Sequence, residues 1–373
     1  MNWKFPYYDI NTGIDWKSID SRFDWFRDME SVPQDAIWHA EGNVQIHTKM
    51  VCEALINLPE YKELDEQERH IVFTSALFHD IEKRSTTTEE ELNGRICVTA
   101  PKHAQKGEYT TRRVLYRDIP TPFYIREVIA KLVRYHGVPL WNDDALERVV
   151  VETSLFVPNK LLAMLSKADV LGRICSDSAE LLEKIEYYKM TAEDLDCFDK
   201  PKEFVSELAR YHFLAKKTFI DYVPFDETKF TVNMLSGIPG SGKDTYISKF
   251  LTGEVISLDD IRRELKIKPT DSKGNGRVIQ EAIERCKVLM RKKVDFTFNA
   301  TNITKELRAK WINLFEEYKG KIVIHYIEVP YSTLLKQNSN REYGVPTDKV
   351  ESLIDKLEMP TVKECTKVVY HTN

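Results

Sequence analysis

The chain has 373 residues, more than one hydrophobic core usually serves, so we expect two domains. Its content of 42% hydrophobic and 30% charged residues is that of an ordinary globular protein, and no stretch approaches the roughly 20 apolar residues of a membrane-spanning helix. The formal charge of −5 divides into −10 for residues 1–230 (30 basic against 40 acidic side chains) and +5 for residues 231–373 (24 against 19), which is consistent with a polyanionic substrate of the C-terminal part.

We expect a cytoplasmic protein that associates with no membrane, because the opening residues MNWKFPYYDINTG have neither the basic start nor the apolar core of a signal peptide. The six cysteines are scattered without a C-x-x-C pair, a pattern that fits neither a disulfide framework nor a zinc ribbon. Buried, reduced thiols are therefore expected. The sequence leaves the oligomeric state open.

Helical spacing of apolar residues dominates the chain up to about residue 220, with breaks rich in Pro, Gly and Thr. The clearest stretches are VQIHTKMVCEALINL (44–58), QERHIVFTSALFHDI (67–81), YIREVIAKLVRYH (124–136) and NKLLAMLSKADVLGRI (159–174). The sequence therefore predicts an all-α N-terminal domain, a helical bundle over residues 1–225.

This helical half carries polar residues of the kinds that bind metal ions. The pair His79-Asp80 closes the apolar helix FTSALFHDIEK, whose end would otherwise not place two polar groups beside a core. Further candidates lie on different predicted helices, which is how a bundle gathers ligands: His47, His103, His136 and Asp169.

These residues suit a pair of divalent cations that share one bridging carboxylate. We expect one cation to be held by His47, His79, Asp80 and Asp169, and a second by Asp80, His103 and His136. Two neighbouring metal ions can share a hydroxide nucleophile and clamp a phosphate, so the set predicts a phosphohydrolase. Nitrogen and oxygen ligands without sulfur suit Mn, Fe, Co, Ni or Zn, and the choice stays open.

Two neighbours of this set are candidates for catalysis. Lys83, one turn after Asp80, is expected to contact the substrate phosphate. His39 would donate a proton to the leaving oxygen or line the pocket, and a structural cap is an equal alternative for it.

The segments HAEGNVQIHT (39–48), FHDIEK (78–83) and KADVLGR (167–173) resemble the HD phosphohydrolase superfamily over roughly residues 35–175. Their HxEGxVxxH spelling is especially close to HD domains attached to tRNA-processing enzymes. The resemblance implies a metal-dependent phosphohydrolase that uses the ordered histidines and aspartates named above.

From residue 226 to 373, short β-branched runs alternate with helical ones, which predicts βαβ units and a parallel sheet flanked by helices. The strand-like runs are FTVNML (230–235), EVIS (254–257), VDFTFNA (294–300), KIVIHYIEV (321–329) and KVVY (367–370). The helical stretches include RVIQEAIERCKVLMRK (277–292) and VESLIDKLEM (350–359). The fold class is therefore multidomain, α followed by α/β.

The first of these strands runs into a glycine-rich turn that opens a helix, the context of a phosphate-binding loop for a nucleoside triphosphate with magnesium. We expect the nucleotide to be bound by Gly237, Gly240, Ser241, Gly242, Lys243, Asp244 and Thr245. Lys243 would lie against the β and γ phosphates. Asp244 occupies the place where Ser or Thr normally holds magnesium, so either Asp244 or Thr245 would bind that ion.

The segment EVISLDDIRREL (254–265) places carboxylates at the end of the second strand, where a base for an incoming hydroxyl is needed. Asp259 is the expected general base, with Asp260 as the alternative. Arg262 would bind the phosphate of the acceptor through its planar guanidinium. Arg341, in LLKQNSNREYGVP (334–346), would bring a cation onto the transferring phosphoryl group.

The segments GIPGSGKD (237–244), LDDIRRE (258–264) and FNATN (298–302), with the lid arginine followed by Val-Pro, resemble the kinase domain of polynucleotide 5′-kinases of the phage end-healing type. The resemblance covers roughly residues 230–373. It implies that Asp259 is the general base for a 5′-hydroxyl, that Arg262 engages the 3′-side phosphate and that Arg341 stabilises the γ-phosphoryl group.

Both halves together resemble the bifunctional HD-domain phosphatase and polynucleotide kinase enzymes of bacterial RNA repair. That resemblance implies removal of 3′-phosphate ends (and of 2′,3′-cyclic or 2′-phosphates), phosphorylation of 5′-hydroxyl ends of RNA or DNA with ATP or another NTP, and a functional link to a ligase. Two alternatives stay open. One is a nucleotidase joined to a small-molecule nucleoside kinase, and the other is a nucleotide-gated RNA-binding or regulatory protein.

Overall fold

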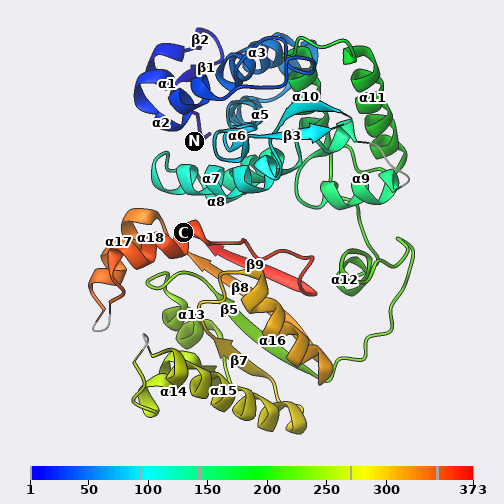
Figure 1. Cartoon of the computed structure of the whole chain (residues 1–373). Helices are drawn as coiled ribbons and strands as arrows, with labels where there is room; N and C mark the ends of the chain where they lie inside the picture. Colours follow the sequence, from blue (N-terminus) through cyan, green and yellow to red (C-terminus); the bar gives the residue numbers. More distant parts are fainter. Residues whose placement is uncertain (1, 93, 142–144, 269–270, 342–343, 373) are drawn as a thin grey trace. The chain divides into compact units, whose positions relative to one another are not determined.

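The computed structural model describes residues 2–92, 94–141, 145–268, 271–341 and 344–372. The chain divides into two compact units, Met1–Glu203 (the N-terminal unit) and Phe204–Asn373 (the C-terminal unit), whose elements are labelled in Figure 1. The expected order, a helical half followed by a parallel sheet flanked by helices, is confirmed.

The two units divide before the boundary that we expected at residue 225. Helix α12 (Glu207–Lys216) belongs to the C-terminal unit, because its polar side chains contact that unit. Tyr211 Oη donates a hydrogen bond to Glu316 Oε1 (2.6 Å), and Arg210 Nη2 donates one to the carbonyl oxygen of Thr366 (3.2 Å). These tertiary contacts left no signal in the local helical spacing.

Helices make up most of the N-terminal unit, and the four helical stretches picked out in the sequence correspond to α3, α5, α8 and α10. The bounds are α1 (Trp16–Arg22), α2 (Asp24–Asp28), η1 (Met29–Ser31), α3 (Val44–Asn57), α4 (Pro59–Glu63), α5 (Glu66–Phe78), α6 (Lys83–Thr86), α7 (His103–Arg117), α8 (Phe123–Tyr135), η2 (Val138–Leu140), α9 (Leu146–Ser154), α10 (Asn159–Leu171) and α11 (Ser178–Asp194). Within the described residues, no single helix has the length and apolar composition to cross a membrane, and one bent pair, α9 with α10, meets that test jointly.

The expectation of an all-α N-terminal half is wrong in one respect, because two small antiparallel ribbons interrupt the helices. Strand β1 (Tyr8–Asp9) pairs with β2 (Gly13–Ile14), and β3 (Thr88–Leu92) pairs with β4 (Arg95–Thr99). The second ribbon had a sequence signal, an Asn-Gly dipeptide at 93–94 between β-branched and threonine-rich runs, which favours a hairpin turn.

The N-terminal helices begin where side chains cap them. Asn43 Oδ1 accepts a hydrogen bond from Ile46 N (2.9 Å) at the start of α3, and Asp65 Oδ1 accepts one from Glu68 N (2.8 Å) at the start of α5. Helix α5 is buried from His70 to Phe78. A helix buried all round lies in the core, so the residues at its C-terminal end are held rigidly.

A network of ion pairs joins α7 to α8. Glu108 is 7% exposed and accepts from Arg112 Nη2 (2.8 Å) and Lys131 Nζ (2.7 Å), while Glu127 accepts from Arg112 Nε (2.8 Å). The two helices run as a hairpin, so the first residue of α7 lies beside the residue that follows α8. These residues are His103 and His136.

We expect Glu108→Gln to lower the free energy of unfolding of the N-terminal unit by about 3 kcal/mol, because the largely buried Lys131 would lose its acidic partner and Arg112 would keep only Glu127. Burial opposes ionisation of Glu108, but Lys131 and Arg112 lower its pKa to about 2. Its stabilising effect is therefore present above about pH 4.5 and is lost as the pH falls toward 2.

Urea unfolding followed by tryptophan fluorescence measures this effect, since five of the six tryptophans lie in the N-terminal unit. The exposed Glu89→Gln, in the same unit, is the matched control and should change little. A Glu108→Gln variant as stable as the wild type at pH 7 would contradict a stabilising role for the network.

The C-terminal unit is a parallel sheet in the order β6-β7-β5-β8-β9, with every neighbouring pair parallel. All five predicted strands and both predicted helices are confirmed. The bounds are β5 (Phe230–Ser236), α13 (Lys243–Phe250), β6 (Glu254–Ser257), α14 (Leu258–Glu264), α15 (Ser272–Lys292), β7 (Phe296–Asn299), α16 (Lys305–Glu317), β8 (Gly320–Glu328), α17 (Tyr331–Ser339), α18 (Thr347–Asp355) and β9 (Lys367–Thr372).

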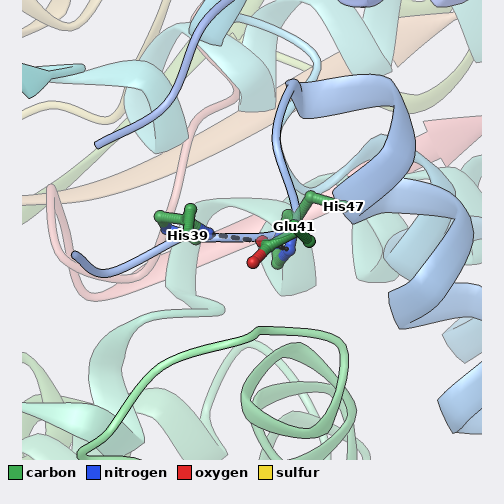
Figure 2. Close-up of side chains that lie close together, drawn as sticks. All are labelled: His39, Glu41 and His47. Atoms are coloured by element: carbon green, nitrogen blue, oxygen red, sulfur yellow. Dashed lines mark hydrogen bonds and ion pairs between the residues drawn. The ribbon is translucent and has the colours of Figure 1, made fainter. Parts of the chain in front are cut away.

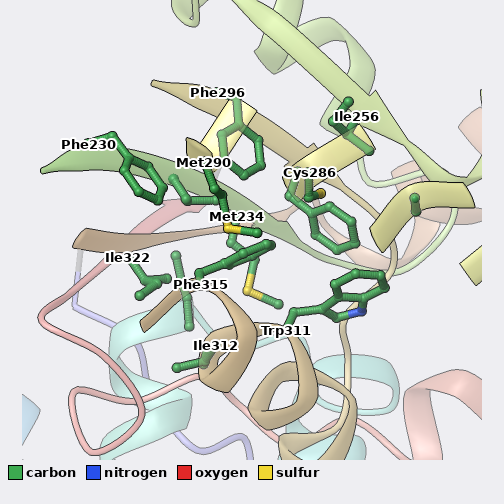
Figure 3. Packing of buried hydrophobic residues seen from close by; sticks show 14 of the residues in the cluster. Phe230, Met234, Ile256, Cys286, Met290, Phe296, Trp311, Ile312, Phe315 and Ile322 are labelled. Carbon is green, nitrogen blue, oxygen red and sulfur yellow. The ribbon is translucent and has the colours of Figure 1, made fainter. Parts of the chain in front are cut away.

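The main core of this unit lies between the sheet and helices α15 and α16, as Figure 3 shows. Residues of β5 alternate between the two faces: Phe230, Val232 and Met234 join this core, whereas Leu235 packs with Ile247 of α13 on a second, smaller cluster. The central strand β5 is thus packed against helices on both faces, and the loop that follows it lies at the carboxyl edge of the sheet. Ligands bind at this edge in open parallel sheets.

Candidate functional site

The N-terminal unit brings together all six predicted metal ligands, which we call the histidine–aspartate cluster: His47, His79, Asp80, His103, His136 and Asp169. Five of them are buried, and His103 is partly exposed. They come from the first turn of α3, the end of α5, the start of α7, the end of α8 and the last turn of α10.

Asp80 lies at the centre, and its two carboxylate oxygens face different histidine pairs. Oδ2 lies 3.2 Å from His79 Nε2 and 3.6 Å from His47 Nε2. Oδ1 lies 3.4 Å from His103 Nε2 and 4.0 Å from His136 Nε2. This is the arrangement expected of a carboxylate that bridges two cations.

Backbone hydrogen bonds fix the orientation of three imidazoles. The Nδ1 atoms of His79, His103 and His136 donate to the carbonyl oxygens three residues earlier in the chain, at 2.7, 2.7 and 2.8 Å. Each Nε2 atom therefore points into the cluster, where it is the ring atom available to bind a metal ion. His103 Nε2 and His136 Nε2 then face each other at 3.4 Å.

The imidazole nitrogens and carboxylate oxygens of the cluster are suited to bind metal ions. Burial lowers the pKa of His103, and burial together with the neighbouring His79 lowers the pKa of His136 to about 3, so both rings are neutral near pH 7. Neither Asp80 oxygen accepts a hydrogen bond of regular geometry from a described residue. Facing lone pairs and a buried, under-satisfied carboxylate are stabilised by cations, and two groups of ligand atoms are close enough to hold them: His47, His79 and Asp80, and Asp80, His103 and His136.

Close backbone packing brings Asp169 to the first of these groups. Gly172 ends α10, and a Cβ atom there would lie only 2.7 Å from the backbone nitrogen of Val51 in α3. Because the two helices approach so closely, His47 Nε2 lies 3.1 Å from Asp169 Oδ1. A glycine is required at this contact.

Positively charged side chains of the protein also lie beside the cluster. Lys83 Nζ lies 2.7 Å from Asp80 Oδ2, and Arg173 donates through Nε to Asp169 Oδ1 (3.1 Å) and through Nη2 to Asp169 Oδ2. Burial opposes ionisation of Asp80, but His79 and Lys83 hold the pKa of that carboxyl well below its usual value. Arg173 was missed in the sequence, although it follows Asp169 by one helical turn.

Glu41 is a second residue that sequence reasoning missed, although it stands in the HxEGxVxxH motif. Figure 2 shows its carboxylate between His39 and His47. Oε1 accepts from His39 Nδ1 (2.8 Å) and lies 2.9 Å from His47 Nδ1, and Oε2 accepts from Ile174 N (2.8 Å). A carboxylate on the far nitrogen of a metal-binding imidazole fixes its orientation, so Glu41 is a positioning residue for His47.

His39 lies beside the cluster as expected. Burial lowers its pKa to about 4, although Glu41 opposes the shift. A neutral imidazole fits the pocket-lining alternative better than proton donation.

Two adjoining cavities of ≈ 500 and ≈ 470 Å³ open onto the cluster. Five residues line both of them: His39, Lys83, His103, Trp141 and Arg173. Positive side chains and metal ligands thus share one accessible space, which could receive a phosphate group.

We expect Glu41→Gln to reduce metal affinity of the N-terminal unit by 10- to 100-fold, roughly the cost of losing such an orienting group. A glutamine amide must turn its NH₂ group either toward Ile174 N–H or toward the two imidazole N–H groups. In both orientations a hydrogen-bond donor would face another donor. Calorimetric titration of the metal-free, full-length protein with a divalent ion measures the change. Glu90→Gln, on the exposed strand β3, is the control, and an unchanged metal affinity in Glu41→Gln would contradict the positioning role.

The C-terminal unit contains the expected phosphate loop between β5 and α13. Gly237 has φ +153°, and a Cβ atom there would lie 2.6 Å from the carbonyl oxygen of Ile327. Gly240 has φ +88°, and its Cβ atom would lie 3.0 Å from Asn338 Cβ. Both positions therefore require glycine. The loop leads to Gly242, which caps α13, so the N-terminus of that helix points into the site.

Lys243 is folded back on this loop. Its Nζ donates to the carbonyl oxygens of Gly237 (2.7 Å) and Ile238 (3.2 Å). Burial lowers the pKa of Lys243 to about 8. A bound polyphosphate would supply the negative charge that this partly buried lysine lacks.

Asp244 and Thr245 both line the cavity of ≈ 340 Å³ in front of the loop, so each of the two alternatives for holding magnesium remains geometrically available. Asp244 Oδ1 accepts from Asn299 Nδ2 (2.8 Å), and Arg341 Nη2 lies 3.9 Å from Asp244 Oδ2. Asn299, at the end of β7, thus orients Asp244. Arg341 reaches the same cavity from beyond α17.

The structure distinguishes the neighbouring carboxylates of α14. Asp259 is among the residues that line the phosphate-loop cavity, whereas Asp260 is not and pairs with Arg263. Arg262 forms an ion pair with Asp259 and donates through Nε to Asn275 Oδ1 (3.1 Å). The position of Asp259 favours it over Asp260 as the base.

A further cavity of ≈ 770 Å³ adjoins the phosphate loop, and Gly242, Thr245 and Gln337 line both spaces. Its wall carries Tyr246 and His371, whose rings lie 4.2 Å apart. Aromatic walls beside a phosphate loop can accommodate the nucleoside part of a nucleotide.

Residues 232–360 match a family model described as an AAA domain. Among curated proteins, L-seryl-tRNA(Sec) kinase of Methanococcus maripaludis is 23% identical over 143 residues, which are 35% of this chain and 53% of the relative. The chain thus spans about half the length of the curated relative that it matches. Both findings support a P-loop kinase-like domain and, with it, a phosphotransferase activity.

Proposed function

We propose that the protein is a bifunctional end-healing enzyme for nucleic acids. The N-terminal unit removes 3′-terminal phosphates, including 2′,3′-cyclic and 2′-phosphates, and the C-terminal unit phosphorylates 5′-hydroxyl ends with ATP or another NTP. The observation that carries the proposal is the presence, in separate units, of a carboxylate whose two oxygens face two pairs of imidazoles and of a phosphate loop with a partly buried lysine. The two sites share no residue.

For phosphorylation, Asp259 accepts the proton of the 5′-hydroxyl as its oxygen bonds to the γ-phosphorus. The bond from that phosphorus to the bridging oxygen breaks, and the nucleoside diphosphate leaves with the electron pair. Lys243 and Arg341 provide positive charge along the phosphates. Arg262, held by Asp259 and Asn275, binds the phosphate on the 3′ side of the acceptor nucleotide.

For hydrolysis, two bound cations would activate a water molecule and neutralise the phosphate. The imidazoles, Asp80 and Asp169 would hold those ions, chosen among Mn, Fe, Co, Ni and Zn. Lys83 and Arg173 line the cavity with positive charge and would bind the phosphate oxygens, and His39 would line the same wall. The water oxygen bonds to phosphorus, the bond from phosphorus to the 3′-oxygen breaks, and that oxygen takes up a proton that originates from the water, which yields inorganic phosphate and a 3′-hydroxyl.

The products, a 3′-hydroxyl and a 5′-phosphate, are the ends that a ligase joins. We therefore propose that the protein acts in the cytoplasm and that a ligase then joins the RNA or DNA ends that it has prepared. The name of the relative favours a second candidate for the C-terminal unit, a kinase whose acceptor hydroxyl is carried on RNA at a position other than the 5′ end.

One assay tests both activities on the full chain. Labelled ATP is supplied with a 5′-hydroxyl oligonucleotide, and a 3′-phosphorylated oligonucleotide is supplied separately, each as RNA and DNA across a panel of divalent cations. We expect label transfer to the 5′ end and phosphate release from the 3′ end. Faster turnover of free nucleosides and nucleotides than of oligonucleotides would favour the small-molecule alternative, and ATP binding without turnover would favour a regulatory protein.

A further inference from the structure

Two exposed tryptophans lie beside the histidine–aspartate cluster. The structure describes all six tryptophans, and Trp38 and Trp141 are the exposed ones, at 46% and 74%. Both line the ≈ 500 Å³ cavity, together with His39, Lys83 and His103. Exposing two such large apolar rings to water is unfavourable, so a shared position at one cavity indicates a ligand surface.

The same cavity contains polar atoms that lack partners. Gln34 Oε1 accepts from Lys83 Nζ (2.8 Å), which fixes the amide, and Gln34 Nε2 is then a buried donor without a hydrogen-bond partner among the described residues. Thr99 Oγ1, in the same lining, is likewise buried without such a partner. Under-satisfied groups of this kind suit a ligand with polar edges.

The cavity is lined by charges of both signs. Lys83 and Arg173 lie at the cluster, whereas Asp177 and Glu180 line the cavity as well, with Lys184 paired to Glu180 (2.7 Å). Carboxylates repel a chain of phosphates. The cavity therefore suits one phosphate at the metal ligands and a neutral, flat, polar-edged group beyond it.

We infer that this cavity binds the terminal nucleobase of the nucleotide whose phosphate is hydrolysed, with Trp38 and Trp141 as its stacking surface and Gln34 and Thr99 as its polar contacts. The inference rests on the proposed 3′-phosphatase function and names its substrate more closely: a 3′-terminal nucleotide that retains its base. Stacking on aromatic rings tolerates every base, which suits an enzyme that repairs ends of any sequence.

The test uses the full-length, metal-loaded protein and an oligonucleotide that ends in 2-aminopurine with a non-hydrolysable 3′-methylenephosphonate. Stacking on tryptophan quenches this fluorescent base. We expect quenching by the wild type, loss of quenching and about tenfold weaker binding in Trp38→Leu and Trp141→Leu, and retention of most binding in the phenylalanine variants. Tyr124→Leu, which removes an exposed ring of α8 outside both cavities, is the matched control.

A second measurement compares phosphate release from 3′-phosphorylated oligonucleotides with a normal or an abasic terminal nucleotide. We expect the wild type to prefer the normal end by about tenfold in kcat/KM and the leucine variants to lose this preference. Equal rates on both ends, or quenching that persists in the leucine variants, would overturn the inference while leaving the phosphatase function in place. Failure of the proposed function looks different, since no phosphate would then be released from either end with any cation, and the quenching alone would decide whether the base is bound.

Discussion

Asp80→Ala is expected to reduce phosphate release from a 3′-phosphorylated oligonucleotide by about 1,000-fold or more and to leave 5′-phosphorylation unchanged. Among the described residues, Asp80 alone belongs to both groups of ligand atoms, so its removal takes a ligand from each cation position. Bound metal ions contribute several kcal/mol to such reactions, and each 1.4 kcal/mol corresponds to about a factor of ten in rate. The metal content of the purified variant should fall together with the hydrolytic rate.

The matched control is Asp194→Ala, which removes an exposed carboxylate of α11 in the same unit. Circular dichroism at increasing temperature shows whether the Asp80→Ala variant is folded. A folded Asp80→Ala protein that still hydrolyses the substrate would refute the assignment of the cluster. A folded variant that has lost both activities would refute the separation of the two sites.

Lys243→Ala is expected to produce the converse result: a loss of 5′-phosphorylation of at least about 100-fold, with hydrolysis unchanged. Lys243 is partly buried and donates to the carbonyl oxygens of Gly237 and Ile238, so its charge lies where the phosphates would bind and is only partly screened by water. Removing one preorganised charge or donor from such a site costs about 10²–10³ in rate. Transfer of label from ATP to a 5′-hydroxyl oligonucleotide measures the loss.

Lys310→Ala, on the exposed side of α16, removes a lysine of the same unit and should leave both activities intact. Binding of a fluorescent ATP analogue separates a binding defect from a catalytic one. Label transfer at the wild-type rate in Lys243→Ala would show that the phosphate loop is not the kinase site. Mixing the Asp80→Ala and Lys243→Ala proteins should restore the complete conversion of both ends.

The local pattern of the sequence determined most of the secondary structure and both sets of candidate ligands. Apolar periodicity gave the helices that contain His47 and Asp169 and the helix that ends just before His79, and the alternation after residue 226 gave the parallel sheet, because these patterns reflect which face of each element is buried. The glycine-rich turn gave the phosphate loop, since Gly237 and Gly240 adopt backbone conformations that other residues rarely reach.

Only the tertiary structure showed how Asp80 divides its oxygens between two imidazole pairs and that Glu41 and Arg173 hold His47 and Asp169. It also moved α12 into the C-terminal unit and placed Trp38 and Trp141, more than 100 positions apart in the chain, at one cavity. The physical reason is the same in each case. Periodicity along the chain records which face of a helix or strand is buried. Contacts between distant segments depend instead on how whole elements pack, and a single glycine such as Gly172 can set the distance between two helices.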